Sequence, residues 1–168
     1  FIALPVVATN LCQALEGGRA LEMLRKYWVI NLCSVAGTII GAQILFLVDA
    51  GILTTLLGVV VVIYVVINAT RFRVRISDRA APWAAPPLGI LSGLLTGTTG
   101  SVGIPIALYL HARDVDKESF LRAIALTFLV SASMLVLALV EKGAISQTNA
   151  LISAISLVPA FAGMLIGQ

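Results

Sequence analysis

The stretch from Leu88 to Leu110 concentrates the residue types that could bind an ion inside a membrane. It carries no charged side chain, but its middle combines glycines, hydroxyl side chains and a proline, namely Gly93, Gly97, Thr98, Thr99, Gly100, Ser101, Gly103 and Pro105. Glycine and proline disfavour a helix interior by about 1 and 3 kcal/mol per position, so we expect a broken helix here. The unpaired N–H groups and positive dipole end of a helix that begins at a break favour anions. The residues therefore indicate an anion site.

Composition places this stretch in a membrane protein. Of the 168 residues, 60% are hydrophobic and only 11% are charged, and the mean hydropathy is +1.05. Soluble domains are nearer half apolar and a quarter charged. Cys12 and Cys33 lie in separate apolar segments without a CxxC pair, so we expect no metal site, cofactor or redox chemistry. The predicted class is an all-α integral membrane protein.

Apolar segments on either side of this stretch predict the helices that position it. A membrane span needs about 20 apolar residues, which residues 28–48 and 50–70 supply as two spans separated by Asp49. Phe1 to Leu15 is predicted as part of a helix, and 16–27 as a basic linker. A basic loop is predicted from Arg71, Arg73, Arg75 and Arg79, and it includes the proline-rich stretch with Pro82, Pro86 and Pro87. Further helices are expected at 123–140 and 144–168.

The positions of the basic residues favour a re-entrant segment. If 87–110 crosses the membrane, eight Lys and Arg fall on one side and three on the other; if it dips in and returns, the division is ten against one. The positive-inside rule favours the second arrangement. We therefore predict a re-entrant hairpin with arms at about 87–97 and 104–110, in the inner (plasma) membrane as a multi-pass protein with its basic loops cytoplasmic. Four arginines beside a span usually set topology, so no nucleic-acid binding is expected.

A faint internal repeat suggests a duplication. Residues 37–43 (GTIIGAQ) resemble 163–168 (GMLIGQ), and residues 2–5 (IALP) resemble 124–127 (IALT), at similar offsets. We predict that residues 1–80 end a first repeat and that 81–168 begin a second. With an odd number of spans per repeat, the two would be inverted, as in many transporters. The chain begins and stops inside apolar segments, which we interpret as an internal piece of a longer protein.

Several motifs together resemble the TauE/SafE sulfite-exporter family, the four-toluene-sulfonate-uptake type of permease. They are GLLTGTTGSVGIPIALYL and RAIALTFLVSAS in the second half, and LPVVATNLCQAL, GTIIGA and GVVVVIYVVI in the first. The resemblance covers nearly the whole chain, and its most specific piece is the glycine-rich break ending in Gly103, Ile104 and Pro105. It implies two homologous halves, each opening with a glycine-rich broken segment, of which the first is absent here. It also implies transport of small sulfur-containing anions such as sulfite or organosulfonates.

The candidate binding residues lie at the break and on flanking helices. The substrate-binding candidates are Gly97, Thr98, Thr99, Gly100, Ser101, Gly103, Pro105, Thr9, Asn10, Thr127 and Ser131. Hydroxyl groups can donate to anionic oxygens, and glycine lets the backbone approach a ligand closely. Each feature also has a purely structural interpretation. The glycines could allow close helix packing, Thr127, Ser131 and Ser133 could bond their own helix carbonyls, and Asn10 could hold helices together.

The leading functional hypothesis is a secondary carrier for small anions, within the lipid bilayer. Proton coupling and homo-oligomerisation are left open, since no carboxylate lies inside a predicted span. The alternatives are an anion channel and a structural membrane subunit that transports nothing. An intramembrane enzyme is disfavoured, because Ser101 is not in a GxSxG motif and the single histidine, His111, lies outside the spans. No catalytic residue is assigned.

Overall fold

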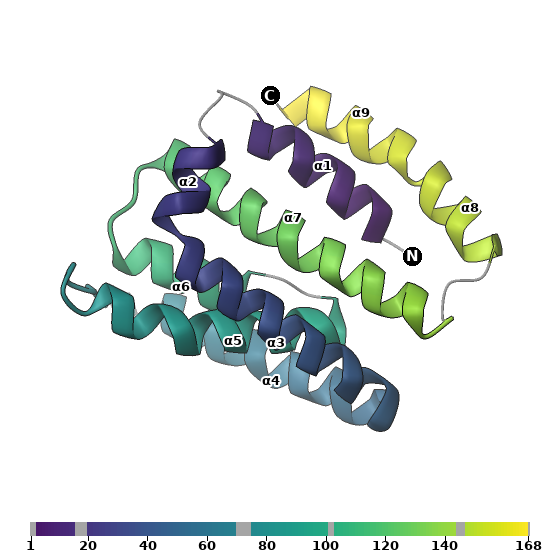
Figure 1. The fold of residues 1–168 in the computed structure, drawn as a ribbon, viewed down its shortest axis with the longest axis horizontal. Helices are drawn as coiled ribbons and strands as arrows, with labels where there is room; N and C mark the ends of the chain where they lie inside the picture. The colour runs from purple at the N-terminus through teal and green to yellow at the C-terminus, as the bar shows by residue number, and fades with distance from the viewer. Residues whose placement is uncertain (1–2, 16–19, 70–74, 101–102, 144–146, 168) are drawn as a thin grey trace.

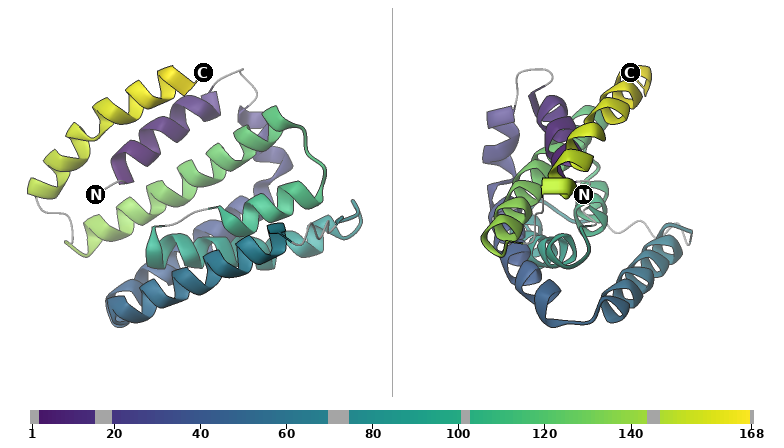
Figure 2. Two further views of the ribbon diagram at one scale, coloured as in Figure 1. Left: turned by 180° about the vertical axis from the view of Figure 1, so that it is seen from behind. Right: turned by 90° about the vertical axis from the view of Figure 1, so that its right-hand side faces the viewer.

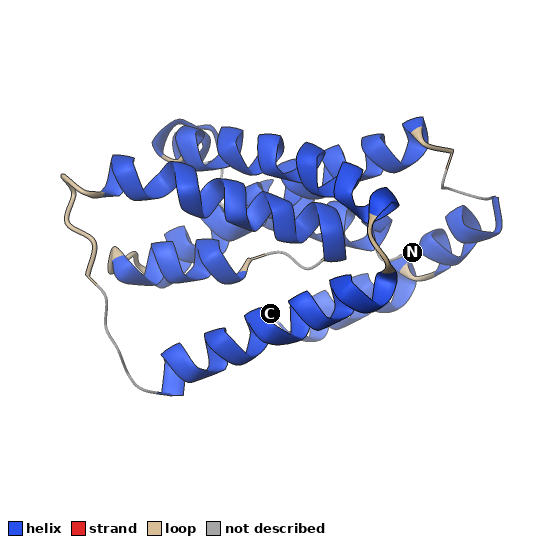
Figure 3. Ribbon diagram, turned by 90° about the horizontal axis from the view of Figure 1, so that it is seen from below, coloured by secondary structure: helices blue, strands red, loops and turns tan. Residues whose placement is uncertain are grey.

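The computed structural model describes residues 3–15, 20–69, 75–100, 103–143 and 147–167, which form helices and connecting turns without a strand in these ranges (Figure 3). The all-α prediction is therefore confirmed. The helices are α1 (Ala3–Leu15), α2 (Ala20–Lys26), α3 (Trp28–Leu47), α4 (Ala50–Ala69), α5 (Ala81–Thr99), α6 (Ile104–Ala112), α7 (Lys117–Glu141), α8 (Gln147–Ile155) and α9 (Leu157–Gly167).

Helix α7 lies at the centre of the bundle (Figure 1). Helix α1 packs on one side of it and α3 on the other, while α8 and α9 lie beyond α1. Helix α5 packs along α3 in the most extensive helix–helix contact of the described residues. The right-hand view of Figure 2 shows α4 leaning away from the other helices. The stretch singled out in the sequence therefore lies against a long neighbouring helix.

Two helices among the described residues are long and apolar enough to cross a membrane. They are Trp28–Leu47, which is α3, and Lys117–Glu141, which is α7. Helix α3 matches the predicted span 28–48, and α4 matches the predicted 50–70 to within one residue. Helix α7 begins six residues before the predicted start at 123, because Asp116 caps it: its Oδ2 accepts a hydrogen bond from the Ser119 N–H at 3.0 Å. That bond lowers the pKa of the Asp116 carboxyl.

The proline-rich stretch was wrongly predicted as loop. Pro82 lies in the first turn of α5, where a helix leaves N–H groups unpaired and a proline loses nothing. Pro86 and Pro87 lie inside α5 and remove the N–H groups that would bond the carbonyls four residues earlier, yet the helix continues. In the same way, the predicted linker 16–27 contains α2, which tertiary contacts with α3 and α7 support.

The last predicted helix, 144–168, is divided in two. Helix α8 ends at Ile155 and α9 begins at Leu157. Pro159 explains the position of the division, because it lacks the N–H that would bond the Ile155 carbonyl. The predicted repeats, 1–80 and 81–168, and their inversion remain predictions.

Candidate functional site

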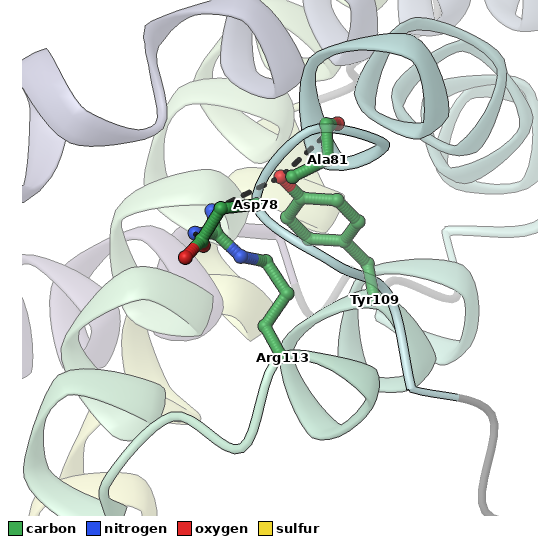
Figure 4. A network of polar contacts seen from close by, with 4 residues as sticks. All are labelled: Asp78, Ala81, Tyr109 and Arg113. Atoms are coloured by element: carbon green, nitrogen blue, oxygen red, sulfur yellow. Dashed lines mark hydrogen bonds and ion pairs between the residues drawn. The ribbon is translucent and has the colours of Figure 1, made fainter.

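Helices α5 and α6 form a hairpin whose open ends are fastened together. The Ile76 N–H, just before α5, donates to the Ala112 carbonyl at the end of α6 over 2.8 Å. Arg113 Nη2 lies 2.8 Å from Asp78 Oδ1, and the Tyr109 hydroxyl donates to the Ala81 carbonyl at 3.5 Å, a long bond (Figure 4). The end of α6 thus returns to the start of α5, which is the geometry that a re-entrant segment requires.

Several charged side chains of the described connections lie at this same end of the bundle. Arg75 Nη2 pairs with Asp114 Oδ2 at 2.9 Å, which joins the approach to α5 with the turn after α6. Helix α2, which carries Arg25 and Lys26, packs against α7, whose first turns carry Arg122. Lys142 follows the other end of α7. The re-entrant arrangement favoured by the ten-against-one division remains a prediction.

The helical conformation stops at Gly100. Gly100 has φ +67° and its N–H bonds the Thr96 carbonyl, while Gly103 has φ +117° and caps the start of α6. Both φ values lie in the left-handed region that favours glycine. Gly97, Thr98 and Thr99 belong to the last turns of α5, so the first arm runs from 81 to 99 rather than from 87 to 97, and the second ends at 112 rather than 110. Ser101 lies outside the described residues.

Three glycines of α5 serve helix packing instead of the break. Gly89, Gly93 and Gly97 lie one above another and face Ile30, Ser34 and Thr38 of α3. A Cβ built on Gly89 would lie 2.7 Å from the Ile30 carbonyl oxygen, and one on Gly97 would lie 2.5 Å from the Ala42 nitrogen. Gly37 and Gly41 of α3 contact α5 backbone in return. These five glycines let the two backbones touch, as small residues do in membrane helix pairs.

The two glycines of the break have different surroundings. A Cβ on Gly100 would meet nothing within 4 Å, and Gly100 is exposed. Gly103 is buried, and a Cβ there would collide with the ring of Phe128 on α7. Pro105, in the first turn of α6, is also buried. The break is thus open on the Gly100 side and closed by an aromatic ring on the Gly103 side.

Most candidate hydroxyls donate to carbonyls of their own helix. Thr98 bonds the Leu94 carbonyl at 2.8 Å and Thr99 the Leu95 carbonyl at 2.7 Å. Thr127 likewise bonds Ala123 at 2.9 Å. A hydroxyl has one proton to donate, so each must release its carbonyl before it can donate to an anion. The structural interpretation given above for Thr127 is confirmed.

The remaining candidates lie on α1 and α7. Thr9 bonds the Pro5 carbonyl and Asn10 the Val6 carbonyl, both within α1, which packs on α7, α8 and α9. Ser131 is fully buried, and its hydroxyl lies 2.8 Å from that of Ser34 on α3. This bond fastens α7 to α3. Ser131, through Ser34, and Phe128, through Gly103, place α7 beside α3 and the Gly103 end of the break.

Sequence reasoning missed a set of buried polar groups between α3, α5 and α7. Ser34, Thr38, Ser92 and Thr96 are all fully buried. Among the described residues, the Ser92 hydroxyl and the Asn31 Oδ1 atom have no hydrogen-bond partner. The signal was present: Ser92 and Thr96 are four residues apart, as are Ser34 and Thr38, so each pair shares a helix face.

Comparison of the whole chain with protein families shows the family to which it belongs. Residues 2–168 match the family described as sulfite exporter TauE/SafE. The chain belongs to this family. No curated protein and no solved structure matches this chain.

Membership of the TauE/SafE family fixes the general setting of the site. Its members are integral membrane transport proteins, so the chain is a membrane protein of a transporter family rather than of an enzyme family. The family implies export of sulfite or sulfonates, and therefore a small anion and membrane lipid as partners. The resemblance found in the sequence motifs is thus confirmed.

Proposed function

We propose that this chain is part of a secondary carrier for small sulfur-containing anions, and that the anion binds at the break between α5 and α6. The observation that carries the proposal is the pair of left-handed glycines at 100 and 103, which end one helix and start another. Irregular backbone at membrane depth occurs where protein covers it or a wet cavity adjoins it. The exposure of Gly100 fits the second of these conditions.

The start of α6 supplies the positive end of a helix dipole, which favours an anion. Among the described residues, the Ala107 N–H makes the first bond of α6, to the Gly103 carbonyl. Pro105 has no N–H, so within this part of the chain the N–H groups of Ile104 and Ile106 are the donors proposed for a ligand. The helix dipole adds about half a positive charge at this end. Backbone N–H groups therefore act as the main donors. Thr98 and Thr99 contribute after they release their helix carbonyls.

The test is anion flux by the full-length chain in proteoliposomes. Sulfite, sulfate, thiosulfate and a sulfonate are offered with and without an imposed pH gradient, which also tests proton coupling. We expect flux of a sulfur oxyanion and its loss in Gly100→Val, because a β-branched residue is a severe outlier at φ +67°. Gly58→Val is the matched control, since a Cβ at Gly58 on α4 meets nothing within 4 Å. Flux no greater than in empty liposomes would favour a structural subunit.

We also propose that α5 and α6 re-enter the membrane from the cytoplasmic side. Single cysteines are introduced by Arg79→Cys, Lys117→Cys and Lys142→Cys after Cys12 and Cys33 are replaced by alanine. With an impermeant thiol reagent on intact cells, we expect labelling at 142 and protection at 79 and 117. Opposite labelling at 79 and 117 would mean that the hairpin crosses instead. Labelling at 79 and 117 with protection at 142 would reverse the orientation.

A further inference from the structure

A polar cleft lies at the open end of the hairpin, opposite the break. It has a volume of about 240 Å³ and is bordered by the start of α3, the start of α5 and the end of α6. Its polar and aromatic lining residues are Lys26, Tyr27, Trp28, Asp78, Tyr109 and Arg113. Neither the family membership nor the proposed carrier site assigns it a role.

The cleft pairs two cations with two buried tyrosines. Lys26 Nζ lies 5.5 Å from the centre of the Tyr27 ring, and the Arg113 guanidinium carbon lies 5.9 Å from that of Tyr109. Both tyrosines are only 3% exposed. Each cation therefore lies over an aromatic face, which attracts it electrostatically. Arg113 is further fixed because its Nη1 donates to the Tyr109 hydroxyl at 3.5 Å.

Tyr27, which lines the cleft, carries a hydroxyl that lacks a partner among the described residues. The Tyr27 hydroxyl is buried and has no hydrogen bond within the part of the chain that the structure describes. Leaving a buried donor unpaired costs about 1–3 kcal/mol. Burial raises the pKa of Tyr27, with nearby Arg113 acting in the opposite direction. The hydroxyl therefore keeps its proton and remains a donor.

A carboxylate already occupies the exposed side of Arg113. Asp78 Oδ1 lies 2.8 Å from Arg113 Nη2 (Figure 4), but the Asp78 side chain is 94% exposed whereas that of Arg113 is 20% exposed. Exposed ion pairs contribute only about 0.2–1 kcal/mol. Another anion can therefore displace Asp78, while Tyr109 still holds Arg113 and the Ile76–Ala112 bond still joins the ends of the hairpin.

From these contacts we infer that the cleft is an oxyanion-binding site in which Arg113, Lys26 and Tyr27 bind the anion and Asp78 competes with it. The chemistry is that of a compact oxyanion, either a solute such as sulfite or the phosphate of an anionic lipid headgroup such as phosphatidylglycerol. Asp116 is the other acidic group that acts on Tyr27 and Lys26. The inference depends on the proposed function only for the choice of sulfite as a probe.

Trp28 provides a direct reporter, because it lines the cleft. The chain has two tryptophans, so Trp83→Phe leaves Trp28 as the single fluorophore. The full chain is placed in phosphatidylcholine nanodiscs and titrated with sulfite in a gluconate buffer. We expect a saturable change in Trp28 emission. Arg113→Gln is expected to weaken binding about tenfold or more, since a hydrogen bond to a charged group contributes about 1.5–3 kcal/mol.

Asp78→Asn separates a binding role from a structural one. It removes the competing carboxylate and is expected to tighten sulfite binding about two- to fivefold, from the strength of an exposed pair. Tyr27→Phe removes the unpaired hydroxyl and tests its role in binding. Lys26→Gln removes the other cation and takes the place of Arg113→Gln in the test if that variant does not fold. Lys142→Gln, at the other end of α7, is the matched control and is expected to change nothing.

A second experiment distinguishes a solute from a lipid headgroup as the source of the anion. In nanodiscs with phosphatidylglycerol, occupation by a headgroup is expected to shift Trp28 emission before sulfite is added and to abolish the titration. Arg113→Gln would reverse that shift. The inference is overturned if neither sulfite nor phosphatidylglycerol gives a response that depends on Arg113, or if Asp78→Asn weakens binding. Sulfite flux without any cleft response would overturn this inference alone, and cleft binding without flux would overturn only the proposed function.

Discussion

Replacing Gly93 with alanine is expected to destabilise the bundle strongly. A Cβ at this position would overlap the Ser34 carbonyl oxygen and lie 2.7 Å from the Thr38 nitrogen. Both neighbours are backbone atoms of α3, so neither can rotate away. Overpacking of this kind costs about 1–3 kcal/mol, or roughly 2–12 °C in the melting temperature of a chain of this size. Thermal unfolding of the purified protein, followed by circular dichroism, measures the change.

Gly58→Ala provides the control for this experiment. Gly58 is an exposed glycine in α4 whose Cβ would meet nothing within 4 Å, so alanine there only adds helix propensity. We expect its melting temperature to equal or exceed that of the native chain. Equal melting of Gly93→Ala and the native chain would mean that α3 and α5 do not touch through their backbones.

The helical class and the two uncharged helices α3 and α4 could be predicted from apolar length alone. Residues 28–47 and 50–69 are uncharged runs of span length, and the bilayer leaves few alternatives to a helix for such a run. Local signals failed where a proline coincided with a helix start. Pro82 suggested a loop, although a proline in the first turn is compatible with a helix because that N–H is unpaired in any case.

Which glycines pack against another helix and which form the break was only partly predictable. Gly89, Gly93 and Gly97 recur every four residues, as do Gly37 and Gly41, and this spacing is typical of close helix contact. The spacing does not indicate which helix these glycines face, because that depends on the tertiary structure. The left-handed φ values at Gly100 and Gly103 also depend on where α5 stops, and boundaries are the weakest part of a pattern-based prediction.

The polar cleft could not have been foreseen from local sequence. Tyr27, Asp78 and Arg113 lie in three separate connections, and only the return of α6 to the start of α5 brings them together. The count of basic residues on each side of the membrane did indicate that these connections share one end of the bundle. It could not indicate which cation would lie over a tyrosine, because that depends on side-chain packing. The inverted repeat remains a prediction.

Gly103→Ala is expected to have the largest effect on transport of any single-methyl change in the chain. It combines two costs: strain at φ +117° and a collision with the Phe128 ring, whose Cε1 atom would lie 2.8 Å from the new Cβ. Gly100→Ala is the matched comparison, since it carries left-handed strain of about 1–2 kcal/mol without any collision. Because Gly103 sets the first turn of α6, its displacement moves the N–H groups proposed to bind the anion.

We therefore expect initial sulfite flux in proteoliposomes to fall about tenfold or more in Gly103→Ala, equivalent to about 1.4 kcal/mol, and by less in Gly100→Ala. Adding Phe128→Ala to Gly103→Ala removes the collision but not the strain, so it should restore flux towards the Gly100→Ala level. Melting temperatures of the same variants separate loss of the site from loss of the fold. If both glycine variants transport sulfite at the native rate, the anion binds elsewhere, and the hydroxyls and unpaired polar atoms between α3, α5 and α7 become the site to test.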